Sequence, residues 1–409
     1  MTSERTQLKR DLRKAGGRRR LTAILLVLPL FLFLLFSFII PIADMLRRSV
    51  VDNELATAWP NTTAMLQAWD HSSPPDEAMF RALGTDLRAS AEVRTIATPA
   101  RRLNYALENG RSLVMNTGRS LRALEGEPQS WRDTLLKEDP SWGDKKTWIA
   151  LAQASGPLTD FYLLTALDLE RDPEGTIVSR PPQQSLYLDV LLRTGTMSLS
   201  VTLLCLVLGF PLAYYVANAP EKTGNLLMIL VLLPLWTSLL VRSAAWIVLL
   251  QDQGLVNAML MAVGFSDRPV PLIYNRIGVL IAMVHVQLPF MVLPIIATMK
   301  AIPTAYMRAA ISLGAHPAIA FVRVYLPQTF PGVAAGTLLV FIMSLGYYVT
   351  PALVGGANDQ MLAYFIAYYT TSSANWGLAA ALGVLLLGAT AVLYFVYARL
   401  TNLGQVKLG

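Results

Sequence analysis

Residues 307–327 read MRAAISLGAHPAIAFVRVYLP and lie between two long apolar runs. The stretch contains small residues, a central Gly-Ala-His-Pro and two arginines, so it is too polar to cross a bilayer. Its regular helical spacing also distinguishes it from an ordinary loop. How this segment is placed decides how the flanking apolar runs are connected.

The spacing predicts two short helices that meet at a bend. Thr304 can cap the first helix, and a narrow face then follows at helical spacing: Met307, Ala310, Ile311 and Gly314. Pro317 favours extended backbone at His316 and itself suits the first position of a second helix. The second helix repeats the spacing with Ala318, Phe321, Val322 and Tyr325.

The bend has the composition of a docking surface. Leu313 offers an apolar knob, and the small residues that would let another backbone approach closely are Ala309, Ala310, Gly314 and Ala315. Pro327 and Pro331 lead into the next apolar run. Two interpretations remain open at this point: a hairpin that packs on its own bundle, and a surface that docks another protein.

The rest of the chain is that of a membrane protein. Of its 409 residues, 54% are hydrophobic and 15% are charged, and the mean hydropathy is +0.45. Apolar runs of spanning length recur and predict six spans, at about 21–43, 190–217, 226–250, 276–299, 331–354 and 378–399. The single cysteine, Cys205, lies inside one of these runs, so it forms no disulfide framework.

The basic residues indicate topology. The net charge is +7, but eight basic residues lie in the tail 1–20 against Glu4 and Asp11, and no aromatic-interleaved basic patch points to nucleic acid. The positive-inside rule therefore places the N-terminus in the cytoplasm, and six crossings return the C-terminal tail 401–409 to that side. The short links that agree contain Lys222, Lys300, Arg308, Arg323, Arg399 and Lys407. The segment 307–327 is then cytoplasmic.

Residues 44–189 separate the first two spans and are long enough to form an external domain. Helical patterns occur at 76–91, 100–121 and 146–169, with breaks at Pro74-Pro75, Pro140 and Gly156-Pro157. We expect a mainly helical insert.

The segment 307–327 resembles the EAA signature of permease subunits in binding-protein-dependent ABC importers. That signature is Glu-Ala-Ala, a Gly after three residues, and, after nine more, an aliphatic residue, any residue and Leu-Pro. The positions that match in register are Ala309-Ala310, Gly314, Val324 and Leu326-Pro327. Arg308 departs from the signature, because the family usually has Glu there.

Further stretches between residues 190 and 400 resemble spermidine/putrescine-type permeases, among them LPLWTSLLVRSAAWIVLLQDQGLVN and GTLLVFIMSLGYYVTPALVGG. The insert at 44–189 is longer than the corresponding loop of typical members. The resemblance implies an all-α membrane protein of the type I ABC importer permease kind. Its parts would be a first helix at 21–43, a periplasmic insert at 44–189, and a five-helix permease core at 190–400.

The resemblance also implies partners. In the family, the coupling segment, here residues 303–327, inserts into a cleft of an ATPase subunit. The residues that would serve this role are Arg308, Ala309, Ala310, Leu313, Gly314, Ala315, His316, Pro317 and Pro327. A second homologous permease, an ATPase dimer and a periplasmic solute-binding protein would complete an importer in the bacterial inner membrane. ATP and Mg would be bound by the ATPase, so no cofactor is expected in this chain.

Candidates for a translocation path are few. Arg242 is the exception in spans that otherwise hold almost no charge, and it either lines the path or anchors the helix near its outer end. No acid lies in the middle of a span, so a cation would pass over aromatic faces. The candidates are Trp236, Trp246, Tyr347 and Tyr348, each of which is also a candidate interfacial anchor. We expect His285 to hydrogen-bond a neighbouring helix.

No enzyme chemistry is expected. The three histidines, His71, His285 and His316, fall in the insert, a span and the cytoplasmic bend, so they do not converge on a metal. Energy would come from the partner ATPase. The alternative is a nucleotide-independent secondary transporter or channel, which would favour ionisable pairs in the spans and broken helices in matching halves. Polyamines are the leading solutes, followed by amino-acid derivatives or opine-like compounds.

Overall fold

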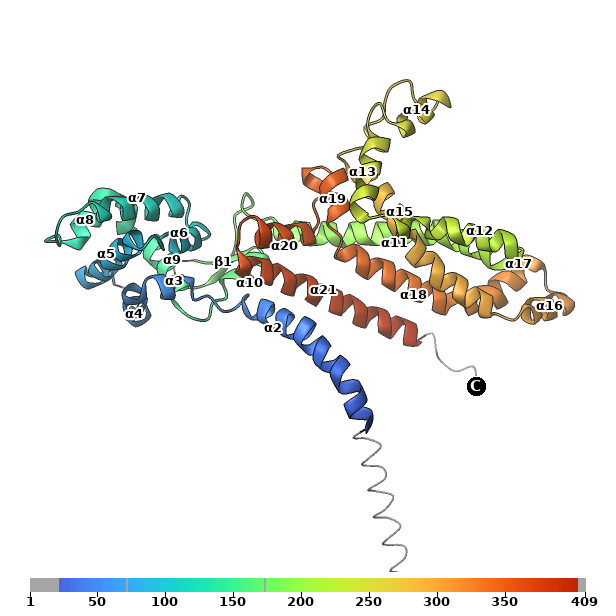
Figure 1. The fold of residues 1–409 in the computed structure, drawn as a ribbon, viewed down its shortest axis with the longest axis horizontal. Coiled ribbons are helices and arrows are strands. Elements are labelled where there is room, and N and C mark those ends of the chain that lie inside the picture. The colour runs from blue at the N-terminus through green and yellow to red at the C-terminus, as the bar shows by residue number, and fades with distance from the viewer. Residues whose placement is uncertain (1–21, 71–72, 173, 404–409) are drawn as a thin grey trace, which may run out of the picture. The chain divides into compact units, whose positions relative to one another are not determined.

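The computed structural model describes residues 22–70, 73–172 and 174–403 (Figure 1). Contacts divide the chain into two compact units, Met1–Asp160 and Phe161–Gly409. The basic tail at 1–20 and Lys407, which carry part of the topology prediction, lie outside the described residues.

The first unit begins with the helix Thr22–Arg47, which is long and apolar enough to span a membrane. A π-turn, η1 (Leu35–Ile39), lies immediately before the proline-containing segment α2 (Ile40–Arg47). Proline lacks the amide that closes a normal turn, and such a widened turn accommodates it. The remaining elements of the unit are α3 (Glu54–Ala58), α4 (Pro60–Ala68), α5 (Glu77–Glu92), α6 (Ala97–Asn104), α7 (Gly110–Arg122), α8 (Trp131–Glu138), η2 (Pro140–Gly143) and α9 (Lys145–Ser155).

Buried tryptophans form the centre of the insert in this unit. The side chains of Trp59, Trp142 and Trp148 are fully buried, and each indole N–H donates a hydrogen bond. Phe80 of α5 packs edge-on against Trp148, with 4.9 Å between ring centroids. A large aromatic core whose polar atoms are paired is what stabilises a helical domain in water.

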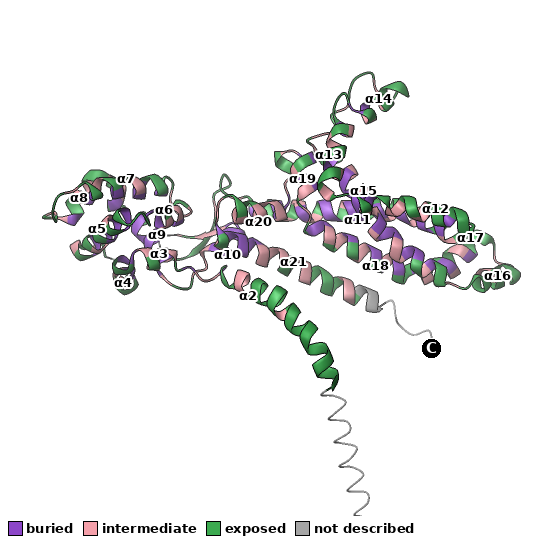
Figure 2. Cartoon of the chain, viewed as in Figure 1, coloured by how far each residue is buried: buried purple, intermediate pink, exposed green. Residues whose placement is uncertain are grey.

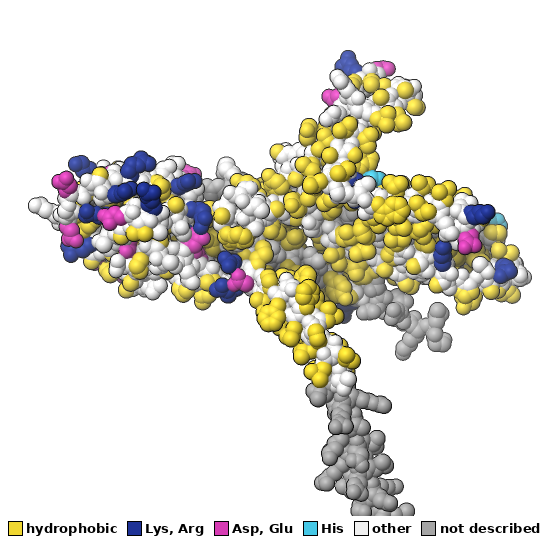
Figure 3. Space-filling model, viewed as in Figure 1, with side chains coloured by type: hydrophobic (Ala, Val, Ile, Leu, Met, Phe, Trp, Pro, Cys, Tyr) yellow, Lys and Arg dark blue, Asp and Glu magenta, His cyan; other side chains and the backbone are white. Residues whose placement is uncertain are grey.

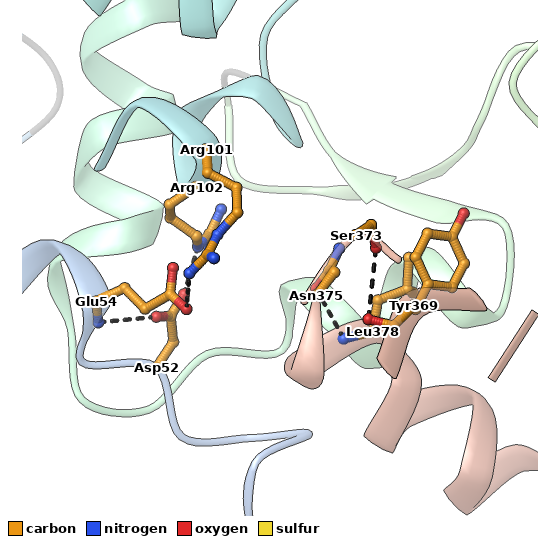
Figure 4. Close-up of polar contacts among 8 residues, drawn as sticks. All are labelled: Asp52, Glu54, Arg101, Arg102, Tyr369, Ser373, Asn375 and Leu378. Atoms are coloured by element: carbon orange, nitrogen blue, oxygen red, sulfur yellow. Dashed lines mark hydrogen bonds and ion pairs between the residues drawn. The ribbon is translucent and has the colours of Figure 1, made fainter. Parts of the chain in front are cut away.

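The insert also buries an ion pair. Arg102 donates through Nε to Asp52, and the two side chains are 1% and 2% exposed (Figure 4). Asp52 Oδ1 also accepts the backbone amide of Glu54 at 3.1 Å. Beside this pair, Arg101 donates to Glu54 Oε1 at 2.9 Å. The loop that enters the insert is thus tied to α6 by charge.

The second unit contains the remaining helices and one short hairpin. Strands β1 (Leu169–Arg171) and β2 (Ile177–Ser179) pair antiparallel. The helices are α10 (Phe161–Ala166), α11 (Tyr187–Asn218), α12 (Glu221–Leu232), η3 (Leu233–Trp236), α13 (Leu239–Leu250), α14 (Leu255–Ala262), α15 (Arg276–Ala301), α16 (Thr304–Ser312), α17 (Pro317–Ala320), η4 (Phe321–Tyr325), α18 (Leu326–Leu345), α19 (Val349–Val354), η5 (Ala357–Asp359), α20 (Leu362–Thr371) and α21 (Trp376–Leu403).

Two side chains fix where the first and last long helices of this unit begin. Asp168, which is buried, accepts the backbone amides of Leu186, Tyr187 and Leu188 at 2.7–3.1 Å and so caps α11. Asn375 accepts the amide of Leu378 at 3.1 Å and caps α21 (Figure 4).

Helices α11, α15 and α18 pack along one another and bury the centre of the unit (Figures 1 and 2). Helices α11 and α15 run in the same direction. Cys205 Sγ lies 3.7 Å from the carbonyl oxygen of Val284, and a Cβ on Gly209 would lie 3.2 Å from Met291. These helices are the second and fourth spans, and a chain that crosses a membrane back and forth must run in the same direction in both.

Helix α18 runs opposite to α15. A Cβ on Gly332 would lie 2.7 Å from the carbonyl oxygen of Pro294, and one on Gly336 would lie 2.9 Å from that of Met291. Glycine therefore lets these two backbones approach to a distance that no other residue permits.

Six described helices are long and apolar enough to cross a membrane, which confirms the predicted number. They are Thr22–Arg47, Tyr187–Asn218, Leu239–Ala262, Arg276–Ala301, Pro317–Leu345 and Trp376–Arg399. Apart from the β1–β2 hairpin and one isolated bridge between Val51 and Leu158, the described residues form only helices and loops, so the all-α fold class is also confirmed.

Two predicted spans have different limits in the structure. The helix expected at 226–250 is interrupted by η3, because Pro234 supplies no amide and Ser238 caps α13 by accepting the amide of Val241 at 3.2 Å. The span expected at 331–354 begins instead at Pro317 and ends at Leu345, before α19. Pro317 and Pro327 lie in the first turns of α17 and α18, where a helix tolerates proline, and Pro331 lies inside α18.

Candidate functional site

The coupling segment forms two short helices, α16 and α17, as the sequence predicted. The expected cap at Thr304 is wrong, because Pro303 occupies the cap position and no side chain accepts an amide there. Thr304 Oγ1 instead accepts a hydrogen bond from Arg308 NH2 at 2.9 Å, one turn further along α16.

Gly314 ends α16 in a left-handed turn. Its φ is +89°, the amide of Gly314 donates to Ile311 O at 2.9 Å, and the amide of Ala315 donates to Ala310 O at 3.1 Å. These two bonds are those of a Schellman motif, in which glycine is preferred because a Cβ would be strained. A Cβ at Gly314 would meet nothing within 4 Å, so the backbone conformation accounts for this glycine.

The second helix starts where the sequence predicted. His316 is extended, at φ −62° and ψ 140°, its Nδ1 accepts the amide of Ala318 at 3.4 Å, and Pro317 is the first helical residue. The chain continues through the π-turn η4 into α18, which has Pro327 in its first turn. The ring of Phe321 packs 5.4 Å from that of Tyr214 on α11. The bend is thereby connected directly to the bundle.

The small residues of the bend do not form one surface. Ala310 and Ala315 are half-buried, and Met307 packs against the bundle core. Leu313 is 89% exposed, and Arg308 and Ala309 are exposed as well. The face that α16 leaves uncovered therefore centres on Leu313 rather than on the alanines.

Among the path candidates, Trp246 has a direct contact with another span. Its indole N–H donates to His285 Nδ1 at 3.1 Å, which joins α13 to α15 and confirms the expected hydrogen bond of His285 to a neighbouring helix. Arg242 lies one turn earlier on α13. Tyr347, between α18 and α19, is half-buried and packs against the bundle core.

Arg242 is also tied to its own chain. Its Nε donates to Thr237 Oγ1 at 3.1 Å, and its NH2 donates to Thr237 O at 2.7 Å. Trp236, in η3, is 72% exposed, and Tyr348, at the cap of α19, is also exposed. Among the contacts of the described residues, none joins Trp236 or Tyr348 to the pair formed by Trp246 and His285.

Two buried polar pairs were missed in the sequence. Ser243 and Thr350 lie 3.0 Å apart at their hydroxyls and link α13 to α19, while Ser344 donates to Gln287 Oε1 at 2.9 Å and links α18 to α15. All four residues are buried. The sequence does contain a signal for such pairs: each is a polar residue within an apolar run, and such residues often hydrogen-bond between membrane helices.

Comparison with known proteins identifies close relatives of the second unit. Residues 207–402 match the family described as binding-protein-dependent transport system inner membrane component. The spermidine/putrescine transport system permease protein PotB of Escherichia coli (strain K12) is 34% identical over 223 residues, which are 54% of this chain and 81% of the relative. PotB of Haemophilus influenzae is 35% identical over 223 residues, 54% of this chain and 78% of the relative.

A solved structure is also similar. A chain of the inward-facing MetNI methionine ABC transporter aligns with a TM-score of 0.44 and 17% identity, over 56% of this chain and all of that chain.

Proposed function

Because this chain belongs to the family of binding-protein-dependent transport system inner membrane components and is a permease subunit of an ABC importer, we propose that α16 and α17 couple it to a separate ATPase. The observation that carries this proposal is the exposed turn at Leu313 and Gly314. It stands in register with the family signature and continues through η4 into α18.

The proposed solute is a polyamine or a related amine or amino-acid derivative. Relatives about one-third identical are named as spermidine/putrescine permeases. The proposed path includes Trp246, Arg242 and Tyr347, and an amine cation would cross it over aromatic faces. The places of Trp236 and Tyr348 on that path stay predictions.

The proposed assembly contains a second homologous permease, an ATPase dimer and a periplasmic solute-binding protein. The chain would lie in a bacterial inner membrane with both termini and α16 in the cytoplasm and the insert outside. ATP and Mg would be held by the ATPase.

The proposed mechanism is a shift between two states of the bundle. Closure of the ATPase dimer displaces α16 and α17. The π-turn η4 transmits the displacement to α18, with which it is continuous, and to α11, because Phe321 and Tyr325 pack on Tyr214. The packed α11–α15–α18 core then moves as a unit between inward-open and outward-open arrangements.

The proposal is tested by Leu313→Ala in the assembled importer. If docking buries Leu313 in the ATPase, truncating its side chain weakens that contact, so we expect ATP-driven uptake into vesicles to fall about tenfold or more. Val263→Ala is the matched control, since Val263 is 85% exposed but lies next to α14. Normal uptake and normal ATPase assembly in Leu313→Ala would refute the coupling role.

Reconstitution distinguishes the nucleotide-independent alternative. A secondary transporter or channel moves solute in vesicles that hold this chain without an ATPase. The importer proposal expects no uptake from such vesicles, and uptake restored by the ATPase, the second permease, the binding protein and ATP together.

A further inference from the structure

The coupling segment carries only positive charge. Between Asp267 and Asp359 the sequence contains no aspartate or glutamate, while Lys300, Arg308 and Arg323 lie in or beside the segment. All three of these cations are exposed, and so is His316. Figure 3 shows Lys and Arg side chains over the end of the second unit that carries α16.

The turn between α11 and α12, which lies beside the coupling segment, does not cancel this positive charge. Helix α11 ends beside η4, where the ring of Tyr214 packs against those of Phe321 and Tyr325. Helix α12 then begins with Glu221 and Lys222. Both residues are exposed and their opposite charges offset each other. The described residues around the bend therefore present a net positive surface.

On α16 this charge stands beside apolar surface. Arg308 is the charged residue of α16, and the exposed apolar side chains of this helix and of the turn after it include Tyr306, Ile311 and Leu313. When such a face is covered by protein, the arginine loses water. An uncompensated cation in an interface is costly, whereas a carboxylate opposite it forms a charge-assisted, bidentate pair.

We propose that α16 docks on an acidic surface of the partner ATPase, which places a carboxylate opposite Arg308 beside an apolar socket for Leu313. This inference rests on the proposed coupling function and specifies its partner. Arg308 reverses the charge that the family signature has at this position, so the ATPase surface that faces it would be negatively charged. An ATPase with a basic socket would be rejected by like-charge repulsion.

Charge reversal tests the proposal. In the purified importer, Arg308→Glu is expected to weaken ATPase binding by about 30-fold or more, and Arg308→Ala by less, because only the reversal adds repulsion. Binding of the unchanged chain should weaken as salt increases, and Arg308→Ala should reduce that dependence. Arg399→Glu is the matched control, since Arg399 is an exposed cation near the end of α21, outside the coupling segment.

The outcomes distinguish failure of this inference from failure of the proposed coupling function. If Arg308→Glu binds the ATPase as well as or better than the unchanged chain while Leu313→Ala still loses uptake, the acidic partner surface is refuted and coupling stands. If neither variant has an effect, coupling itself fails. Anionic lipid is the other candidate for these cations. An Arg308 effect seen only in bilayers containing phosphatidylglycerol, and absent in neutral ones, would overturn the inference.

Discussion

The insert and the membrane bundle close their interiors by different means. The insert buries three tryptophans and the ion pair of Arg102 with Asp52. The bundle of the second unit instead brings α15 and α18 together at Gly332 and Gly336 and links helices through hydroxyl and amide pairs. Their outer surfaces differ as well: on the face shown in Figure 3, charged side chains are frequent on the insert, whereas hydrophobic ones dominate the bundle.

The difference follows from the solvent of each part. In water, burial of large apolar side chains supplies the driving force, and it is strong enough to retain a paired charge. Between helices in lipid that force is absent, so close packing at small residues and interhelical hydrogen bonds must stabilise the contact. Deleting one polar group should therefore destabilise the insert far more than the bundle.

The largest effect is expected from Asp52→Ala in the insert. This change removes the carboxylate that Arg102 Nε meets in the interior, and breaking a buried ion pair from one side costs about 3–5 kcal/mol. We expect the unfolding temperature of the insert to fall by roughly 10 °C or more in the detergent-solubilised chain, measured by resistance to protease on heating.

The double variant Asp52→Ala, Arg102→Met is the control, because it removes both charges and keeps an apolar side chain of similar length. Its stability should recover most of the loss. If Asp52→Ala alone leaves the insert unchanged, the ion pair does not contribute to the stability of this core.

A smaller effect is expected from Gly336→Ala in the bundle. The added Cβ would lie 2.9 Å from the carbonyl oxygen of Met291, so α15 and α18 must separate, at a cost of about 1–3 kcal/mol. Thermal unfolding of the bundle in detergent measures this. Gly388→Ala on α21 is the matched control, since its Cβ would meet nothing within 4 Å and alanine favours a helix. Equal stability of the two variants would show that close backbone approach does not stabilise the bundle.

Local chemistry predicted much of this fold. The apolar runs located α11, α15 and α21, because each is long enough to span and has few charges. The bend at the coupling segment followed from Gly314 and from the His316-Pro317 pair, whose backbone preferences act within two residues.

The remaining features depend on tertiary packing. The exposed face of α16 was not predictable, since Ala309 and Ala310 are equally small and only the bundle decides which is covered. The contact of Ser243 with Thr350 joins residues 107 positions apart, and no local pattern specifies such a pairing. The start of the fifth span at Pro317 was missed because the helix continues past Pro327, which follows the π-turn η4, and past Pro331 inside α18.

The smallest effect is expected from Ser243→Ala, the bundle's counterpart of the insert's ion pair. The hydroxyl of Ser243 meets that of Thr350 at 3.0 Å in a buried contact between α13 and α19. Interhelical hydrogen bonds in membranes contribute only about 0.6 kcal/mol on average, because helices apart in lipid find other partners for the same groups. A double-mutant cycle with Thr350→Val, read by thermal unfolding in detergent, isolates this coupling. Ser200→Ala is the control, since Ser200 is only half-buried and its hydroxyl bonds within its own helix to Thr196 O. A coupling as large as that of Asp52 with Arg102 would mean that polar pairs stabilise both interiors alike, and the contrast between the two solvents would fail.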